Sequence, residues 1–284
     1  MTISVGVIGI GALGEPIAGL LLKAGFATSV CDVRRDPLER LAKLGATPCA
    51  SAAEVARYSD VIVSLVLDEA QTTDVVCGKS GLLGEIRPGA VLAIGSTLGP
   101  DAVRRIAETL GPKRAHVLDI PISGGIVAAR EGALSVMAGG EEAVIERAMP
   151  ALKVFARDIT RTGGVGSGQT AKLAHQLVFS VNVMALLEGL ALGAAGGLEP
   201  GVLKEVLRTG LANSAVLQAW PDLGSRWKGM LAPSAPGMPP PNLRKDLHLV
   251  LQLAGELGVP LHIASQASRI ADAGIATGQA DPRL

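Results

Sequence analysis

The chain has 284 residues, enough for about two domains with buried cores. Lys and Arg together number 26, as do Asp and Glu, and only 2% of the residues are aromatic. The zero net charge gives no basic surface for nucleic acid or an anionic membrane, and few rings are available for base stacking. With 48% hydrophobic and 18% charged residues, the composition is that of a folded protein.

The first 160 residues alternate short β-rich runs with helical patterns. This alternation predicts a parallel sheet with helices on both faces, because strands buried on both faces have continuous apolar runs. The expected strands span residues 3–8, 28–32, 61–66, 90–94, 115–119 and 134–138. The expected helices span residues 12–24, 37–44, 51–57, 70–76, 100–110 and 141–152.

After Arg161 the pattern becomes helical. A glycine-rich joint at 162–168 precedes a long apolar helix, and we place the domain boundary there, giving an α/β domain at 1–162 and an all-helical domain at 163–284. The proline-rich stretch 232–241 can be neither helix nor central strand, so it is either an ordered lid or a mobile loop. The expected helices span 169–195, 199–209, 243–257 and 261–274.

The cysteines and the apolar segments indicate the compartment. Cys31, Cys49 and Cys77 lack any disulfide-framework or metal-ligand spacing, which favours a reducing cytoplasm and no metal site. The N-terminus has no basic region before its apolar run, so it predicts a first strand and no signal peptide. The mean hydropathy is +0.40. The most apolar segment, 177–198, contains polar residues and several glycines, and predicts a buried interdomain helix rather than a membrane span.

A glycine motif follows the first expected strand. Residues 9–14 have the pattern GxGxxG directly after that strand and at the start of a helix. Gly9 makes the tight turn, Gly11 lets a pyrophosphate approach the backbone, and Gly14 lets the helix pack closely on the strand. The helix N-terminus offers N–H groups to the phosphates. The pattern predicts a dinucleotide site rather than a glycine-rich turn without a ligand.

An acidic residue at the end of the second strand supports this prediction. Asp32 follows Gly14 by 18 residues, where a carboxylate accepts hydrogen bonds from the adenosine ribose and repels a 2′-phosphate. NAD is therefore favoured. Arg34 and Arg35 follow at once, and their guanidinium groups are suited to a 2′-phosphate, so NADP stays open as the alternative.

Three further segments carry candidate chemistry. Residues 119–125 end a strand with a serine and two glycines, whose hydroxyl and N–H groups can hold a carboxylate. Residues 166–176 begin the long helix, and Lys172 and His175 share one of its faces at i and i+3. Lys245 begins a Lys-Asp-Leu motif on a late helix.

Together with residues 8–14 and 96–100, these segments resemble the β-hydroxyacid dehydrogenase family over nearly the whole chain. That family includes 3-hydroxyisobutyrate dehydrogenase, tartronate semialdehyde reductase and, more remotely, 6-phosphogluconate dehydrogenase. The resemblance implies an N-terminal Rossmann domain, a long interdomain helix and an all-α C-terminal domain. It also implies a homodimer or homotetramer, and an enzyme that transfers hydride between NAD and a short β-hydroxy acid.

The resemblance assigns roles residue by residue. Lys172 matches the catalytic lysine, and desolvation of such a buried amine favours its proton-accepting form. The expected substrate-binding residues are Ser123, Gly124, Gly125, His175 and Gln176. The expected cofactor-binding residues are Gly9, Gly11, Ala12, Leu13, Gly14, Asp32, Val33, Arg34, Leu65, Val66, Thr97 and Lys245.

The chain departs from the family pattern at His175, where most members have asparagine, and at Gln176, where members often have a second asparagine. The His-Gln pair resembles a subgroup that acts on polyhydroxylated four-carbon acids such as threonate. We hypothesise that His175 hydrogen-bonds the substrate, with simple packing beneath the lysine as the alternative. Two other functions stay open: an NADPH-dependent aldehyde or imine reductase, and a catalytically silent nucleotide-binding module. Lys172 argues against imine reduction, since imine reductases usually have another residue there.

Overall fold

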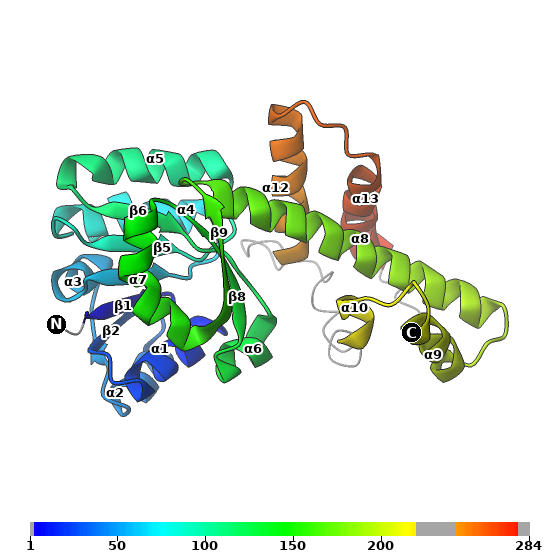
Figure 1. Cartoon of the computed structure of the whole chain (residues 1–284), viewed down its shortest axis with the longest axis horizontal. Coiled ribbons are helices and arrows are strands. Elements are labelled where there is room, and N and C mark those ends of the chain that lie inside the picture. The colour runs from blue at the N-terminus through cyan, green and yellow to red at the C-terminus, as the bar shows by residue number, and fades with distance from the viewer. Residues whose placement is uncertain (1–2, 220–241, 278–284) are drawn as a thin grey trace. The chain divides into compact units, whose positions relative to one another are not determined.

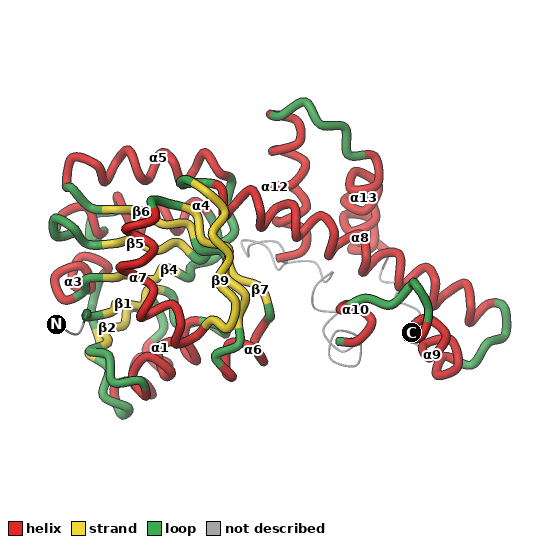
Figure 2. Tube along the Cα trace, in the orientation of Figure 1, coloured by secondary structure: helices red, strands yellow, loops and turns green. Residues whose placement is uncertain are grey.

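The chain forms two units, Met1–Lys172 and Leu173–Leu284, which we describe separately. The structure is a computed structural model and describes residues 3–219 and 242–277. The proline-rich stretch 232–241 lies outside these residues. Figures 1 and 2 show strands only in the N-terminal part of the described chain, where the sequence predicts them.

Six parallel strands form most of the sheet in the first unit. Their order is β3-β2-β1-β4-β5-β6, the arrangement of a dinucleotide-binding Rossmann sheet. Five of these strands form at the short apolar runs that predict them in the sequence, whereas β3 was not predicted and its two residues are exposed. The bounds are β1 (Val5–Ile8), β2 (Thr28–Cys31), β3 (Thr47–Pro48), β4 (Val61–Ser64), β5 (Val91–Ile94) and β6 (His116–Asp119).

The other edge of the sheet differs from the prediction. Strand β8 (Leu134–Gly139) runs antiparallel to β6 and β7 (Ile122–Ser123), so the all-parallel arrangement is wrong here. The physical reason is length, because 124–133 is shorter than the crossover of about a dozen residues that parallel neighbours need. Strand β9 (Ala156–Gly163) pairs parallel with β8 and was not predicted.

Helices cover both faces of the sheet, as the alternation of elements predicts. Alternate side chains of each buried strand enter two separate cores. Val5 and Val63 pack with α1, α2 and α7, whereas Ile8 and Ile62 pack with α3, α4 and α5. Helix α6 was not predicted. The bounds are α1 (Gly14–Lys23), α2 (Arg35–Ala42), α3 (Ala52–Tyr58), α4 (Glu69–Cys77), α5 (Pro100–Leu110), α6 (Gly125–Glu131) and α7 (Glu142–Phe155).

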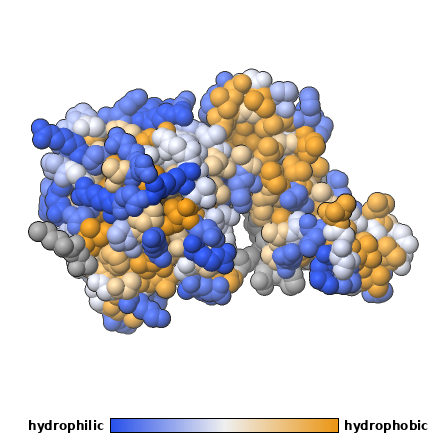
Figure 3. Space-filling view, viewed as in Figure 1, coloured by the Kyte–Doolittle hydropathy of each residue, from blue (hydrophilic) through white to orange (hydrophobic). Residues whose placement is uncertain are grey.

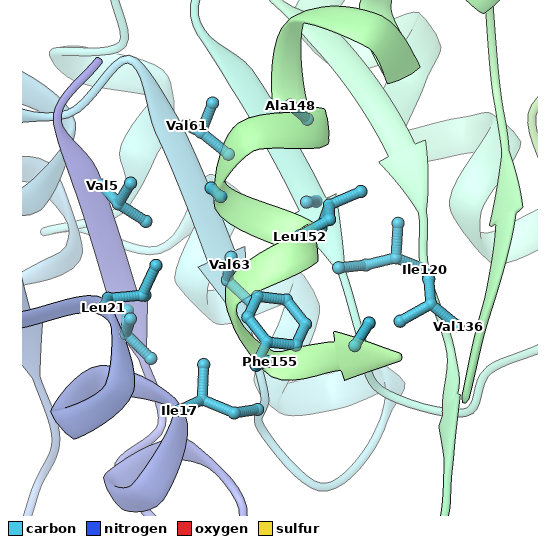
Figure 4. Close-up of a cluster of buried hydrophobic side chains, with 14 of the residues drawn as sticks. Val5, Ile17, Leu21, Val61, Val63, Ile120, Val136, Ala148, Leu152 and Phe155 are labelled. Atoms are coloured by element: carbon cyan, nitrogen blue, oxygen red, sulfur yellow. The ribbon is translucent and has the colours of Figure 1, made fainter. Parts of the chain in front are cut away.

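Phe155 is the largest side chain that is fully buried among the described residues. It ends α7 and lies between Ile17 and Leu21 of α1 and the strand that carries Val63 (Figure 4). This packing closes the sheet face that carries α1, the helix that follows the glycine motif. The core therefore holds the predicted cofactor turn against the sheet.

The described secondary-structure elements of the second unit are all helices. Helix α8 (Ser167–Ala195) begins in the first unit and continues into the second. Val183 and Met184 of α8 pack with Leu243 and Leu247 of α12. The short helix α10 was not predicted. The bounds of the other helices are α9 (Pro200–Thr209), α10 (Ala215–Gln218), α12 (Asn242–Glu256) and α13 (His262–Thr277).

Helix α8 is long and apolar enough to cross a membrane by length and composition, although only 28% of its most apolar window is buried in the chain. A single helix of this kind is weak support for a membrane span. Val178 is 59% exposed and Leu192 is 77% exposed. Apolar residues also show on the visible surface of the second unit (Figure 3). Among the described residues, the prediction of a buried helix therefore holds only in part: Val183, Met184 and Leu190 are buried, whereas Val178 and Leu192 are exposed.

Candidate functional site

The glycine motif makes a tight turn between β1 and α1. Gly9 has φ +89°, a left-handed conformation that favours glycine. A Cβ on Gly14 would overlap the carbonyl oxygen of Gly9, whereas a Cβ on Gly11 would meet no heavy atom within 4 Å. Among the described residues, no side chain caps the start of α1, which begins beside the exposed Ala12 and half-buried Leu13. The turn thus offers backbone N–H groups and room for a pyrophosphate.

Asp32 is held against this turn by two kinds of donor. Its Oδ2 accepts from Ile10 N at 2.6 Å, and its Oδ1 accepts from Arg34 N at 2.9 Å and Arg34 Nε at 3.0 Å. Burial by itself would raise the pKa of Asp32, but these hydrogen bonds and the Arg34 charge hold that pKa below its usual 3.8. Asp32 is therefore ionised at neutral pH, as recognition of ribose hydroxyls requires. Val33, beside it, is fully exposed.

Arg34 contacts both Asp32 and the glycine turn. Its Nη2 donates to Ile10 O at 2.7 Å and to Asp32 Oδ2 at 3.2 Å. The guanidinium group therefore bridges the carboxylate to the glycine turn. The Asp32 carboxylate, which favours NAD, and the Arg34 guanidinium group, which suits NADP, are thus ion-paired with each other.

The ends of β4 and β5 are tied together near Thr97. Ser96 Oγ donates to Val66 O at 2.6 Å, just after Leu65. The buried amide of Gln169 brackets Thr97: its Nε2 donates to Ser96 O at 2.8 Å, and its Oε1 accepts from Leu98 N at 2.9 Å. The first turn of α8 thereby fixes the loop that carries one predicted cofactor residue.

The structure brings Lys172 to the predicted carboxylate-binding segment. Lys172 is 6% exposed, and its Nζ donates to Ile122 O at 2.8 Å, next to half-buried Ser123. Gly124 and Gly125, both exposed, have φ +125° and +69°, conformations that a side chain would strain. An amine, a hydroxyl and a glycine backbone therefore lie side by side in the first unit.

Asp119 anchors the helix that carries Lys172. Its carboxylate is fully buried and accepts from Gly166 N and Gln169 N, each at 2.8 Å. Burial raises the pKa of Asp119 above its usual 3.8, while these N–H donors oppose the shift. The carboxylate satisfies donors at the beginning of α8.

The second unit holds the remaining predicted residues in one polar chain. His175 Nδ1 lies 3.0 Å from Gln176 Oε1, and Gln176 Nε2 donates to Asp246 Oδ2 at 2.6 Å. Lys245 Nζ pairs with Asp246 Oδ1 at 3.1 Å. The His175 ring stacks on Phe179, one turn further along α8, with ring centroids 6.5 Å apart.

Sequence reasoning missed Asp119, Gln169 and Asp246. Each stands inside a segment that the sequence singles out, yet none was given a role. A signal was available only for Asp119, since a carboxylate is a suitable acceptor for the N–H groups at a helix start. The partners of Gln169 are more than 70 residues away in the chain, and no local pattern specifies them. No group of three or more potential metal ligands occurs among residues 3–219 and 242–277.

The strand order, the glycine turn and Asp32 together define a dinucleotide-binding protein. Residues 4–164 match the family model of the NAD-binding domain of 6-phosphogluconate dehydrogenase. Residues 166–282 match the model described as NAD-binding of NADP-dependent 3-hydroxyisobutyrate dehydrogenase.

This chain aligns with several relatives over most of its own length and most of theirs. The 2-hydroxy-3-oxopropionate reductase of Escherichia coli (strain K12) is 34% identical, covering 90% of this chain and 86% of its own. The L-threonate dehydrogenase of Cupriavidus necator is 34% identical, covering 75% and 72%. The crystal structure of 3-hydroxyisobutyrate dehydrogenase from Salmonella typhimurium has a TM-score of 0.84 at 32% identity, covering 97% and 95%. The chain belongs to the β-hydroxyacid dehydrogenase family, whose members use NAD or NADP.

Proposed function

We propose that this protein oxidises the β-hydroxyl of a short hydroxy acid with NAD, and reduces the matching semialdehyde in the reverse direction. The observation that carries the proposal is the buried Lys172, whose Nζ lies against Ile122 O beside Ser123, in the unit that also holds the glycine turn. A buried amine thus lies next to a segment whose hydroxyl and N–H groups can hold a carboxylate.

The proposed mechanism divides the work among these residues. Ser123 Oγ and the N–H groups of Gly124 and Gly125 bind the substrate carboxylate and orient the carbinol carbon. Lys172 Nζ accepts the hydroxyl proton as the carbon–oxygen double bond forms, and returns that proton during reduction. Bound NAD supplies the hydride acceptor at nicotinamide C4. Ile122 O holds the lysine in place by accepting from its Nζ.

The glycine turn is suited to NAD, because there is room for a pyrophosphate at Gly11 and because Asp32 is ionised. We propose that Asp32 and Val33 face the adenosine, that Leu65, Val66 and Thr97 line the path toward nicotinamide, and that Lys245 contacts the cofactor. NAD is preferred to NADP because the Asp32 carboxylate repels a 2′-phosphate.

We propose that His175 and Gln176 contact the substrate. Lys172 and His175 are three residues apart on one continuous helix, so their side chains leave α8 in similar directions. An imidazole offers hydrogen bonds that suit a hydroxyl-rich acid. The similarity to an L-threonate dehydrogenase supports this choice.

A panel of acids tests the proposed function. We expect NADH formation with β-hydroxy acids drawn from 3-hydroxyisobutyrate, 3-hydroxypropionate, glycerate, threonate and serine, and the highest kcat/KM with an acid that has a second hydroxyl. Matched acids without a β-hydroxyl serve as controls and are expected to give none. Tight NADH binding without turnover of any hydroxy acid would contradict the proposal, and turnover only of aldehydes or imines with NADPH would favour the reductase alternative.

We propose that the chain forms a homodimer or a homotetramer in the cytoplasm, through the exposed apolar face of α8 that includes Val178 and Leu192. The three free cysteines support a reducing compartment. Light scattering after gel filtration is expected to give two or four times the chain mass of 28.9 kDa. Leu192→Asp is expected to lower that mass, whereas Leu44→Asp, at an exposed position of the first unit, leaves it unchanged. A monomeric wild type would contradict the proposal.

A further inference from the structure

Four polar residues of the second unit form a connected series of hydrogen bonds and one ion pair, in which each donor and acceptor is determined by its neighbour. They are His175 and Gln176 on α8, and Lys245 and Asp246 on α12. Gln176 and Asp246 are buried, next to the apolar contacts of Leu243 and Leu247. Buried polar groups of this kind are costly when they are not satisfied, so their hydrogen-bond directions are strongly determined.

The Asp246 carboxylate determines how the Gln176 side-chain amide is oriented. Asp246 Oδ1 lies 3.1 Å from Lys245 Nζ in an ion pair, and a carboxylate in an ion pair only accepts hydrogen bonds. The group that Gln176 turns toward Asp246, 2.6 Å away, must therefore be its NH2 group. The opposite orientation would set an amide oxygen against a carboxylate oxygen.

The orientation of the Gln176 amide in turn determines which ring nitrogen of His175 carries the proton. With its nitrogen committed to Asp246, its Oε1 faces His175 Nδ1 at 3.0 Å and can only accept. The proton must therefore be on Nδ1. Stacking on Phe179 restrains the ring in this orientation. A neutral imidazole with its proton on Nδ1 presents Nε2 as an acceptor.

We propose that Asp246 is a positioning residue, which acts through Gln176 to hold His175 in the Nδ1–H tautomer. In this form Nε2 accepts a hydrogen bond from a hydroxyl of the substrate, a step that rests on the proposed function. Asp246 thereby selects the partner of His175: a hydroxyl donor is favoured, and a carbonyl or carboxylate oxygen is disfavoured.

The tautomer can be observed directly in the whole protein without any substrate. The chain has four histidines, so 15N NMR of histidine-labelled protein gives few signals, and the spectrum of His175→Asn assigns those of His175. Above the titration range of the imidazole, we expect a protonated Nδ1 and an unprotonated Nε2. Gln176→Met and Asp246→Ala are expected to move the proton toward Nε2. Asp246→Asn, whose amide oxygen still accepts from Gln176, is expected to restore the wild-type pattern.

Asp272→Ala is the matched control, since Asp272 lies 3.4 Å from His248 Nε2 and outside this chain of residues. It is expected to leave the His175 signals unchanged. An Nε2–H tautomer in the wild type, or an unchanged tautomer in Gln176→Met, would overturn the proposal for Asp246.

Kinetics test the role of Nε2 separately. With the preferred hydroxy acid, Asp246→Ala is expected to lower kcat/KM by about 3- to 10-fold, the value of one hydrogen bond, with Asp246→Asn close to wild type. Thermal unfolding followed by circular dichroism is measured alongside as a check on folding. An unchanged kcat/KM in Asp246→Ala, together with a shifted tautomer, would overturn the substrate contact. The expected tautomer without turnover of any hydroxy acid would support the Asp246 network and contradict the proposed function.

Discussion

Lys172→Met is expected to lower kcat by about 100- to 10,000-fold while NADH affinity is retained, the range typical for loss of a positioned acid–base group. Methionine keeps most of the aliphatic volume in this buried position but has no nitrogen to take up a proton. Because Lys172 Nζ bonds Ile122 O beside Ser123, the substitution is expected to remove the proton-accepting group at that segment while the cofactor turn is kept.

Steady-state kinetics with the best acid of the panel and fluorescence titration with NADH provide the measurement. Lys153→Met is the matched control, because Lys153 is exposed on α7 of the same unit. It is expected to keep wild-type kcat. A Lys172→Met variant that retained more than about a tenth of the activity would show that another group moves the proton.

Asp32→Ala is expected to weaken NADH binding by about 10- to 100-fold, the value of hydrogen bonds to a charged acceptor. The same change removes the ion-pair partner of Arg34, whose guanidinium group then becomes available to a 2′-phosphate. NADPH binding is therefore expected to weaken less than NADH binding, or to become tighter. Because hydrogen bonds hold the pKa of Asp32 below its usual value, NADH affinity in the wild type is also expected to stay constant from pH 6 to pH 8 as far as this carboxylate is concerned.

Parallel titrations with NADH and NADPH measure the preference. Asp36→Ala removes a carboxylate from an exposed position of α2 and is expected to change neither affinity. An equal loss for both cofactors would indicate that Asp32 only stabilises the turn. No loss for either would remove Asp32 from the cofactor site altogether.

The central strands and covering helices could be predicted because each carries its own local signal. The runs at β1 and β4 are continuous and apolar, and α5 begins at a proline and ends near a glycine. Strand β9 lacks such a signal, because its residues are mostly exposed and three of the eight are charged. The two-residue strands β3 and β7 are too short for any periodicity.

The candidate site could be predicted only where a motif has a local cause. Gly9 and Asp32 follow from the turn geometry and the strand end. The roles of Gln169 and Asp246 depend on partners about 70 residues away in the chain, which no local pattern specifies. The exposed face of α8 was missed for a related reason: apolar character predicts burial, but it does not say by which chain.

The hydrogen bonds of Gln169 and Asp119 determine where the two domains of this fold can be separated or exchanged. The family models divide the chain near residue 165, yet the interior of the first unit is completed by side-chain and backbone groups of α8. A nucleotide-binding fragment ended at Gly164 would leave Asp119 without the N–H groups of Gly166 and Gln169. Exchange of helical domains between relatives is therefore best made beyond Lys172, so that the first turns of α8 travel with the sheet they complete.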